Sequence, residues 1–416
     1  MRMAFFTQNV KKGGLDTFVV NLLLHWPSSD SITLFCNRSH PGLADLRIRV
    51  PKHVVVVPYD FLIAQDIEAR FADRSRLVQL MIKVLFRLVG IPYLVFKARQ
   101  LFSAARLDRL MVINGSYPGG DACIGATLAW ATLHPGRLAW HNVHNLALPY
   151  HRSVLRRMKE RVIDWMMAQS VAGFIGVSSS CIESLSIRSG LNGCRKAFVY
   201  NGTEPINSAQ TSSLREKLSL PAGAQIVLML AVYESRKGHD FMIRVMRDVV
   251  AAVPEAYLLV CGDGTEKERQ VIRNLRTMSP VASHVVLQPH RPDIGNVMGQ
   301  VQVLVAPSQS DESFGYTVAE AMACALPVVV TDVGGLPEVV EHGVTGYVVG
   351  RADAKEFAAR VVQLLRDEAQ RRQMGQMGLK RFEKHFLAER MTREYVRLSD
   401  NPALLGQDCV RRGAHS

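Results

Sequence analysis

Residues 312–330 read ESFGYTVAEAMACALPVVV and join a glycine-containing loop, a helical pattern and a strongly apolar strand pattern. Glu312 lies in the loop, and Glu320 lies eight positions later on the helical segment. A short apolar strand beside a helix is typical of a parallel sheet that is covered on both faces. The segment therefore predicts an α/β fold, with one carboxylate in a loop and a second on the helix that leaves it.

The same alternation of strands and helices continues along the 416 residues. In the second half, the buried-strand patterns are IVLMLAVY, AYLLVCGD, HVVLQPH, VQVLVAPS and LPVVVTD. The first half offers strand candidates at residues 4–6, 32–36, 54–57, 110–113 and 138–140. Two such sets predict two Rossmann-like domains, joined near the polar segment 201–213. Ligands of such sheets bind at the carboxyl ends of the strands, so a cleft between the domains is the expected site.

Composition narrows the classes of protein. The seven cysteines are scattered and no Cys-x-x-Cys occurs, which argues against a disulfide framework or a zinc site and favours a reducing compartment. The opening MRMAFFTQNV has too short an apolar run for a signal peptide and is predicted to be the first strand.

The net charge lies in the first half of the chain. Residues 1–200 contain 25 Lys and Arg against 12 Asp and Glu, so 25 − 12 = +13, and the remainder is neutral with 25 of each. A basic half predicts an anionic partner, such as a phosphorylated substrate or an anionic membrane surface. Nucleic acid is disfavoured, because there is no zinc-finger spacing, aromatic RNA-binding signature or basic-region heptad.

Two apolar segments of this half are candidates for contact with a membrane. Residues 77–96 contain central cations and a Gly-Ile-Pro that should interrupt a helix, so a core or interfacial helix is expected rather than a membrane span. Residues 150–167 predict an amphipathic helix that either lies on an anionic membrane or packs on its domain with a solvated basic face. Its cations are Arg152, Arg156, Arg157, Lys159 and Arg161.

The two carboxylates fit the ends of a nucleotide sugar bound at a helix N-terminus. The amides of Gly315, Tyr316 and Thr317 would point at the diphosphate, Glu320 would reach the ribose, and Glu312 would reach the sugar. On spacing alone, a helix N-terminus whose dipole favours acidic residues is an equal alternative.

Two further loops favour an anionic ligand. Arg236 and Lys237 lie in ESRKGHD between a strand and a helix, where parallel sheets bind phosphate, although an ordinary basic turn would look the same. Gly13 and Gly14 lie in KKGG after the first strand and permit close approach to an anion, although Gly-Gly is also a routine turn.

With these motifs the second half resembles the family 4 glycosyltransferases, which are retaining enzymes of the GT-B fold. The matching segments are RKG (236–238), CGDG (261–264), RPDI (291–294), VLVAPS (303–308), residues 312–335 and PEVVEHGVTGYVV (337–349). The first half matches more loosely through GGLD (13–16), VHN (143–145), GVSSSCIESL (176–185) and YNGTE (200–204).

The resemblance implies a role for several residues. Glu320 would hold the ribose and Glu312 the donor sugar, while Lys237 would neutralise the diphosphate. Gly13 and Gly14 would approach the phosphates. His144 would lie near the reacting centre, with His141 as a nearby alternative.

The chain departs from the family pattern at three places. The usual arginine five or six positions before the lysine is replaced by Ala231 and Val232, so Arg236 would have to substitute. The acidic position of GGxE is Asp16. Ala325 takes a glycine position in CALP, and we expect this change to affect packing.

The resemblance also implies a domain plan and an activity. The N-terminal domain would span residues 1–203, with a last helix of about 386–400 crossing back to it, and a donor domain would span 204–385. We expect a hexosyltransferase without metal or cofactor, moving sugar from a nucleotide sugar to a lipid-linked or anionic glycan at the cytoplasmic face of the membrane. A sugar-nucleotide epimerase of the same fold and a non-catalytic binding or scaffold protein remain the alternatives.

Overall fold

The computed structural model describes residues 1–63, 66–67, 70–136, 138–206, 213–291 and 293–400. The chain divides into two compact units, of which the first comprises Met1–Asn201 and the segment that begins at Ala388, and the second comprises Gly202–Leu387. The predicted domain boundaries at 203/204 and 385/386 lie two residues from these. The predicted linker falls partly on residues 207–212, outside the described residues.

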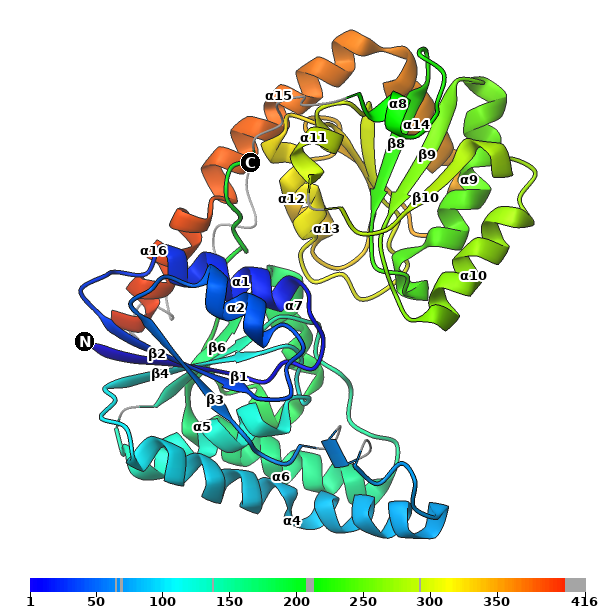
Figure 1. Ribbon diagram of the computed structural model, residues 1–416. Coiled ribbons are helices and arrows are strands. Elements are labelled where there is room, and N and C mark those ends of the chain that lie inside the picture. The colour runs from blue at the N-terminus through cyan, green and yellow to red at the C-terminus, as the bar shows by residue number, and fades with distance from the viewer. Residues whose placement is uncertain (64–65, 68–69, 137, 207–212, 292, 401–416) are drawn as a thin grey trace. The chain divides into compact units, whose positions relative to one another are not determined.

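Unit 1 is built on a parallel sheet with the strand order β3-β2-β1-β4-β5-β6-β7 (Figure 1). Because β1 is central and β4 lies on its other side, the strand order reverses between these two strands, which is where such sheets bind ligands. The strands are β1 (Arg2–Thr7), β2 (Ser31–Asn37), β3 (Val54–Tyr59), β4 (Arg109–Asn114), β5 (Ala139–Val143), β6 (Val171–Gly176) and β7 (Lys196–Phe198).

Helices connect these strands, and the last helix of the described chain returns to the unit. The helices are α1 (Gly14–Leu24), α2 (Leu43–Arg49), α4 (Arg76–Ser103), α5 (Asp121–Leu133), α6 (Val154–Ser170), α7 (Ser179–Glu183) and α16 (Ala388–Asp400). Helix α16 packs on α1, where the Thr392 hydroxyl donates to the Leu22 carbonyl over 3.2 Å. The guanidinium of Arg109 donates to the Ser399 carbonyl over 2.5 Å, which fixes the end of α16 at the start of β4.

Unit 2 repeats the plan with the strand order β10-β9-β8-β11-β12-β13, and its reversal lies between β8 and β11. The strands are β8 (Gln225–Leu230), β9 (Ala256–Cys261), β10 (Val285–Gln288), β11 (Val303–Ala306), β12 (Val328–Thr331) and β13 (Gly346–Val349). The helices are α8 (Leu214–Lys217), α9 (His239–Ala252), α10 (Glu266–Thr277), α11 (Ile294–Met298), α12 (Tyr316–Ala323), α13 (Leu336–Val339), α14 (Ala354–Arg366) and α15 (Glu368–His385).

The predicted strands are present in both units, and their ends differ by at most three residues. Strands β6, β7 and β13 were not among the predictions. Strands β7 and β13 are short, and β6 and β13 contain glycines that weaken the apolar pattern. All three pair in parallel with their neighbours, so the sheet supplies pairing that their own sequences do not indicate.

Helix α4 differs from the prediction for residues 77–96. The helix is assigned continuously through Pro92 to Ser103, so the expected interruption at Gly-Ile-Pro is wrong. Instead, the segments Arg76–Phe86 and Val89–Ser103 meet at 58°. Because proline lacks an N–H and its ring crowds the carbonyl four residues earlier, Pro92 weakens the helix where this bend occurs.

The amphipathic helix α6 begins later than predicted. Its first residue is Val154, with Ser153 as N-cap, so Tyr150 and Arg152 lie in the preceding loop. The sequence PYHRS contains a proline and a serine, which favour a loop and a helix start respectively. No single described helix is long and apolar enough to cross a membrane, although the two bent segments of α4 pass that test together by length and composition.

Candidate functional site

The switch point of unit 2 brings a lysine and a glutamate into contact. Lys237 ends a 3-10 turn (Ser235–Lys237) between β8 and α9, and Glu312 lies in the loop between β11 and α12. The Lys237 ammonium Nζ lies 2.5 Å from the Glu312 Oε2. The Ser308 hydroxyl donates to the same oxygen over 2.9 Å. Neighbouring strands β8 and β11 therefore place the predicted pair together, and Ser308, at the end of the VLVAPS motif, is a partner that the sequence analysis missed.

Arg236 ties the two loops together. Its Nε donates to the Glu234 carboxylate over 2.6 Å, and its Nη1 donates to the Asp311 carbonyl over 2.8 Å. In return, the amide of Gln309 donates to the Arg236 carbonyl over 2.7 Å. The guanidinium thus has partners in the structure, and its expected role as a phosphate ligand stays a prediction.

The main chain of Glu312 is fixed by the glycine pair after β12. The Gly335 amide donates to the Glu312 carbonyl over 2.8 Å. Gly334 has φ +56°, and a Cβ atom there would lie 1.9 Å from the same carbonyl oxygen. No other residue fits this close approach, so VGG (333–335) positions the carboxylate although it contributes no side chain to it.

Helix α12 begins at Tyr316, after Gly315 in a left-handed conformation with φ 97°. The amides of Gly315, Tyr316 and Thr317 therefore lie at the helix N-terminus, as predicted from the sequence. Glu320 lies in the second turn, and no described residue donates a hydrogen bond to its carboxylate. Burial raises the pKa of Glu320 to about 7.

Ala325 corrects one expectation. It follows α12 with φ 51°, in the left-handed region that glycine adopts at little cost. The departure from the family's glycine therefore affects backbone conformation rather than packing. A non-glycine residue in this region carries roughly 1–2 kcal/mol of strain.

The Gly13–Gly14 loop lies at the switch point of unit 1, where α1 begins. Asp16 holds this loop, because its carboxylate accepts from the Gly13 amide over 3.1 Å and from the Asn9 side chain over 2.6 Å. The buried His40 ring lies 3.0 Å from the same carboxylate. A Cβ atom on Gly13 would meet nothing within 4 Å, so no described protein atom explains the glycine.

The two histidines of WHNVHN have different surroundings. His141 is fully buried, and its ring nitrogens lie 3.1 Å from the Asn114 amide nitrogen and 3.0 Å from the Thr127 hydroxyl. His144 follows β5 at the carboxyl edge, and its Nε2 has no hydrogen-bond partner among the described residues. Burial lowers the pKa of both rings to about 3, so both are neutral. The structure therefore gives His141 a core role, and only His144 keeps a ring nitrogen for a ligand.

The five predicted surface cations do not form one uniform face. Arg152 precedes α6, Arg156 donates to the His151 ring over 2.8 Å, and Arg161 lies over the Tyr150 ring with its Cζ 5.6 Å from the centroid. Arg157 is half-buried, whereas Lys159 is exposed and interacts with other residues. Within the described residues, no group of three or more His, Cys, Asp or Glu could hold a metal ion.

Comparisons with known proteins show which family the second half of the chain resembles. Residues 210–381 match the family described as glycosyl transferases group 1. The chain carries a group 1 glycosyl transferase domain. Over 186 residues it is 28% identical to N-acetyl-alpha-D-glucosaminyl L-malate synthase of Bacillus anthracis, covering 44% of this chain and 47% of that protein. Over 184 residues it is 30% identical to the lipopolysaccharide core biosynthesis glycosyltransferase LpsE of Rhizobium meliloti, covering 44% and 52% respectively. The chain thus spans about half the length of the curated relatives that it matches.

A solved structure extends the likeness to the fold of the whole chain. HepE of Anabaena, crystallised with UDP, superposes with a TM-score of 0.74 at 18% identity and covers 96% of this chain and 100% of its own. With its group 1 domain and two parallel-sheet units, the chain has the predicted GT-B fold class. Family 4 membership stays a prediction. Lys237, Glu312 and Glu320 all fall inside the matched residues 210–381.

Proposed function

We propose that this protein is a retaining, metal-independent hexosyltransferase that moves a sugar from a nucleotide sugar to the hydroxyl of a glycan or lipid-linked acceptor. The observation that carries the proposal is the contact of Lys237 with Glu312 at the switch point of unit 2. A cation and a carboxylate placed there match the two ends of the bond that such an enzyme breaks, the diphosphate and the sugar.

Each residue of this site has a role in the proposal. The Lys237 ammonium and the N-terminal amides of α12 stabilise the negative charge that grows on the leaving diphosphate. Glu312, held by Ser308 and Lys237, accepts hydrogen bonds from donor-sugar hydroxyls. Glu320 accepts from the ribose. Arg236 supports the loop between these groups and contributes positive charge beside the diphosphate.

Unit 1 supplies the acceptor side in this proposal. Gly13 and Gly14 leave room for the donor phosphates, and His144 lies close to the reacting sugar. The net charge of residues 1–200 favours an anionic acceptor, such as a lipid-linked intermediate of surface polysaccharide or glycolipid synthesis. We place the enzyme in the cytoplasm, peripherally on the inner face of the cytoplasmic membrane, and we expect no nucleic-acid partner.

The test compares Glu312→Gln with the native chain in the presence of EDTA. A panel of nucleotide sugars is first screened for thermal stabilisation, and hydrolysis or transfer of the stabilising donor is then measured. We expect Glu312→Gln to lower turnover at least about tenfold, because a hydrogen bond to a charged group contributes roughly 1.5–3 kcal/mol. Glu368→Gln is the matched control, because this glutamate pairs on the surface with Arg372 and should leave turnover unchanged.

The outcomes separate the alternatives. Turnover that needs added magnesium or manganese would contradict the metal-independent part of the proposal. Release of an epimerised nucleotide sugar without transfer would identify the epimerase alternative. Donor binding without any turnover would identify a binding protein.

A further inference from the structure

An apolar groove runs along one flank of unit 1, between α4, α5 and α6. It has a volume of about 600 Å³, and its lining is almost entirely apolar. Val95 comes from α4, Leu128 from α5, and Val162, Trp165 and Met166 come from α6. The groove contains none of the residues assigned above to the donor or to the reacting centre.

A second cavity of about 330 Å³ adjoins this groove and has a different character. The two share Ile91, Lys159 and Ile163 in their linings. Beyond these, the lining of the second cavity combines apolar side chains such as Phe86 and Ile124 with polar ones such as His151 and Arg156. Two acidic residues, Asp121 and Glu160, also line this cavity. Burial raises the pKa of Asp121, although the nearby Lys159 acts to lower it. The Glu160 carboxylate accepts a hydrogen bond from the backbone amide of His151 over 3.2 Å.

The two cavities lie at defined ends of the sheet. Helices α5 and α6 both begin after the carboxyl ends of strands, so the charged cavity, lined by Asp121 and Arg156, lies toward the carboxyl edge. The apolar groove includes Thr132, Met166 and Ser170 near the ends of these helices, so it extends toward the opposite edge. The charged end thus shares the edge of the sheet on which Gly13 and His144 lie.

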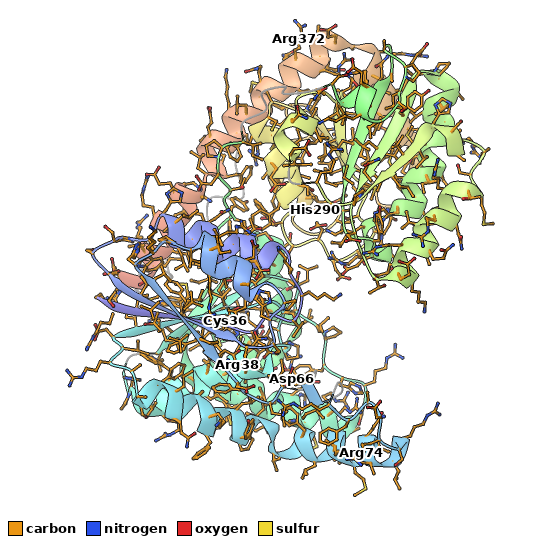
Figure 2. The ribbon with its side chains drawn as sticks, in the orientation of Figure 1. Cys36, Arg38, Asp66, Arg74, His290 and Arg372 are labelled. Atoms are coloured by element: carbon orange, nitrogen blue, oxygen red, sulfur yellow. The ribbon has the colours of Figure 1, made fainter. Side chains whose placement is uncertain are left out.

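Further exposed apolar side chains lie on two of the helices that line the groove. On α4 they include Leu80, Met81 and Leu85, and on α6 they include Leu155 and Met158. Figure 1 shows both helices on the same flank of unit 1, and in Figure 2 Arg74 marks the approach to the first turn of α4. An apolar surface of this extent with a cationic margin is suited to an amphiphile, since lipid binding combines buried apolar area with attraction to anionic headgroups.

We infer that the groove binds the hydrocarbon chain of an anionic amphiphile whose phosphate lies in the adjoining cavity beside Arg156 and His151. This inference rests on the proposed function, because it assigns the occupant of the groove as the lipid-linked acceptor. The lipid chain lies along α6, and its phosphate end faces the edge of the sheet where transfer would take place. A phosphate with an apolar chain fits both cavities, whereas a soluble anionic glycan would leave the apolar groove without an occupant.

Monomeric alkyl phosphates test the groove without a bilayer. Octyl, decyl and dodecyl phosphate are titrated into the full chain below their critical micelle concentrations, with inorganic phosphate and decanol as partial ligands. Trp165 reports binding, because its side chain is 63% exposed whereas those of Trp26, Trp130 and Trp140 are buried. We expect each added methylene to tighten binding about fourfold until the groove is filled. Inorganic phosphate should bind far more weakly than any alkyl phosphate.

Two matched pairs of variants locate the site. Val162→Phe narrows the groove, whereas Val154→Phe makes the same change at a residue that lines neither cavity. Both valines are on α6 and are similarly exposed, at 56% and 58%. Arg156→Gln should weaken the binding of decyl phosphate about tenfold and leave the binding of decanol unchanged. Arg157 lines neither cavity, so Arg157→Gln should change the binding of neither ligand. Val95→Phe repeats the narrowing from the α4 side.

The assignment of the groove would be wrong if the two variants of each pair changed ligand binding equally. It would also be wrong if the affinity for alkyl phosphates did not depend on the length of the alkyl chain. Binding to anionic vesicles with no binding of monomeric alkyl phosphates would also overturn it and would leave only a surface patch. Thermal stabilisation by a nucleotide sugar, measured on the same variants, separates these results from the proposed function. If the Val162→Phe variant no longer binds decyl phosphate but is still stabilised by the nucleotide sugar, the inference is supported. If the native chain binds alkyl phosphates but no nucleotide sugar, the proposed function fails and the groove stands.

Discussion

Glu320 combines burial with a proposed role, ribose binding, that requires a charged carboxylate. Its pKa of about 7 results from burial, and no described residue offers the carboxylate a hydrogen bond. The ribose hydroxyls would be the missing donors. The free protein therefore holds a carboxyl group that is half protonated near neutral pH, and donor binding would favour its ionised form.

We predict that donor affinity falls with pH below about 7 in the native chain. Each pH unit below the pKa should weaken binding by a factor of up to about ten, equivalent to roughly 1.4 kcal/mol. Calorimetric titration with the intact nucleotide sugar between pH 6 and 8 measures this, because its diphosphate does not titrate in that range. Glu320→Gln should bind more weakly at pH 8 and show no such slope. The same slope in both proteins would contradict the assignment.

The raised pKa of Glu320 also makes the free energy of unfolding depend on pH. The folded state favours the protonated form of Glu320, and this preference stabilises the fold. The stabilisation is complete below 4.5, the pKa of the unfolded chain, and is lost as the pH rises through about 7, the pKa of the folded protein. The free energy of unfolding of the native chain should therefore fall between these pH values relative to that of Glu320→Gln, in the absence of donor.

Ala325 is predicted to be a site where glycine stabilises unit 2. Ala325→Gly relieves left-handed strain at φ 51° and should raise the free energy of unfolding by about 1 kcal/mol. Ala323→Gly is the matched control, because this residue ends helix α12 and glycine there should cost up to about 1 kcal/mol. Denaturation followed by circular dichroism measures both. A loss of stability in Ala325→Gly would show that the Ala325 side chain matters for packing, as the sequence analysis expected.

At the scale of single residues, the motifs located the charged groups but not their supports. Lys237 and Glu312 were assigned to one ligand through the family motifs, whereas their direct contact depends on the adjacency of β8 and β11, which the sequence analysis did not predict. Ser308 and Gly334 could not be assigned, because their roles depend on a hydrogen bond and a close approach across separate loops. His144 was distinguished from His141 only by burial and hydrogen bonding, which two histidines three positions apart do not reveal in sequence.

At the scale of elements, α16 depends on a buried tyrosine. The Tyr395 hydroxyl accepts from the Asn142 side chain, and the ring packs edge-on against Phe18 with centroids 5.5 Å apart. We predict that Tyr395→Phe lowers the stability of unit 1 by about 1–3 kcal/mol, because the buried Asn142 amide loses its partner.

Tryptophan fluorescence during denaturation measures this change, because all four tryptophans belong to unit 1. Identical unfolding midpoints for Tyr395→Phe and the native chain would show that the Asn142 contact contributes nothing.

The helices of unit 1 mark the limit of prediction from periodicity. The apolar run in residues 77–96 indicated a helix, but its exposed first half and its bend depend on what packs against it and on Pro92. The basic run in residues 150–167 indicated an amphipathic helix, but the helix begins only at Val154. The spacing of apolar residues predicts that a helix has an apolar face. It does not predict whether protein or lipid covers that face.

At the scale of the whole molecule, the two-domain plan was readable because each half repeats the alternation of strands and helices. The return of α16 to unit 1 came from family resemblance, since an amphipathic helix at the end of a chain carries no signal for the partner on which it packs. The uneven distribution of charge was readable directly from composition, and it leads to the last prediction.

We predict that the full chain binds anionic vesicles in a salt-sensitive manner and does not bind neutral ones. Residues 1–200 carry the net charge of 25 − 12 = +13, and each basic residue near an anionic surface contributes about 1 kcal/mol, which salt screens. Replacing Arg156, Arg157 and Lys159 together by glutamine should weaken sedimentation with vesicles. Replacing Arg244, Arg247 and Arg372 of unit 2, which are all exposed, should not weaken it. If both triple variants lose binding equally, overall charge rather than α6 governs association, and if the native chain ignores anionic vesicles at low salt, the acceptor reaches the enzyme from solution.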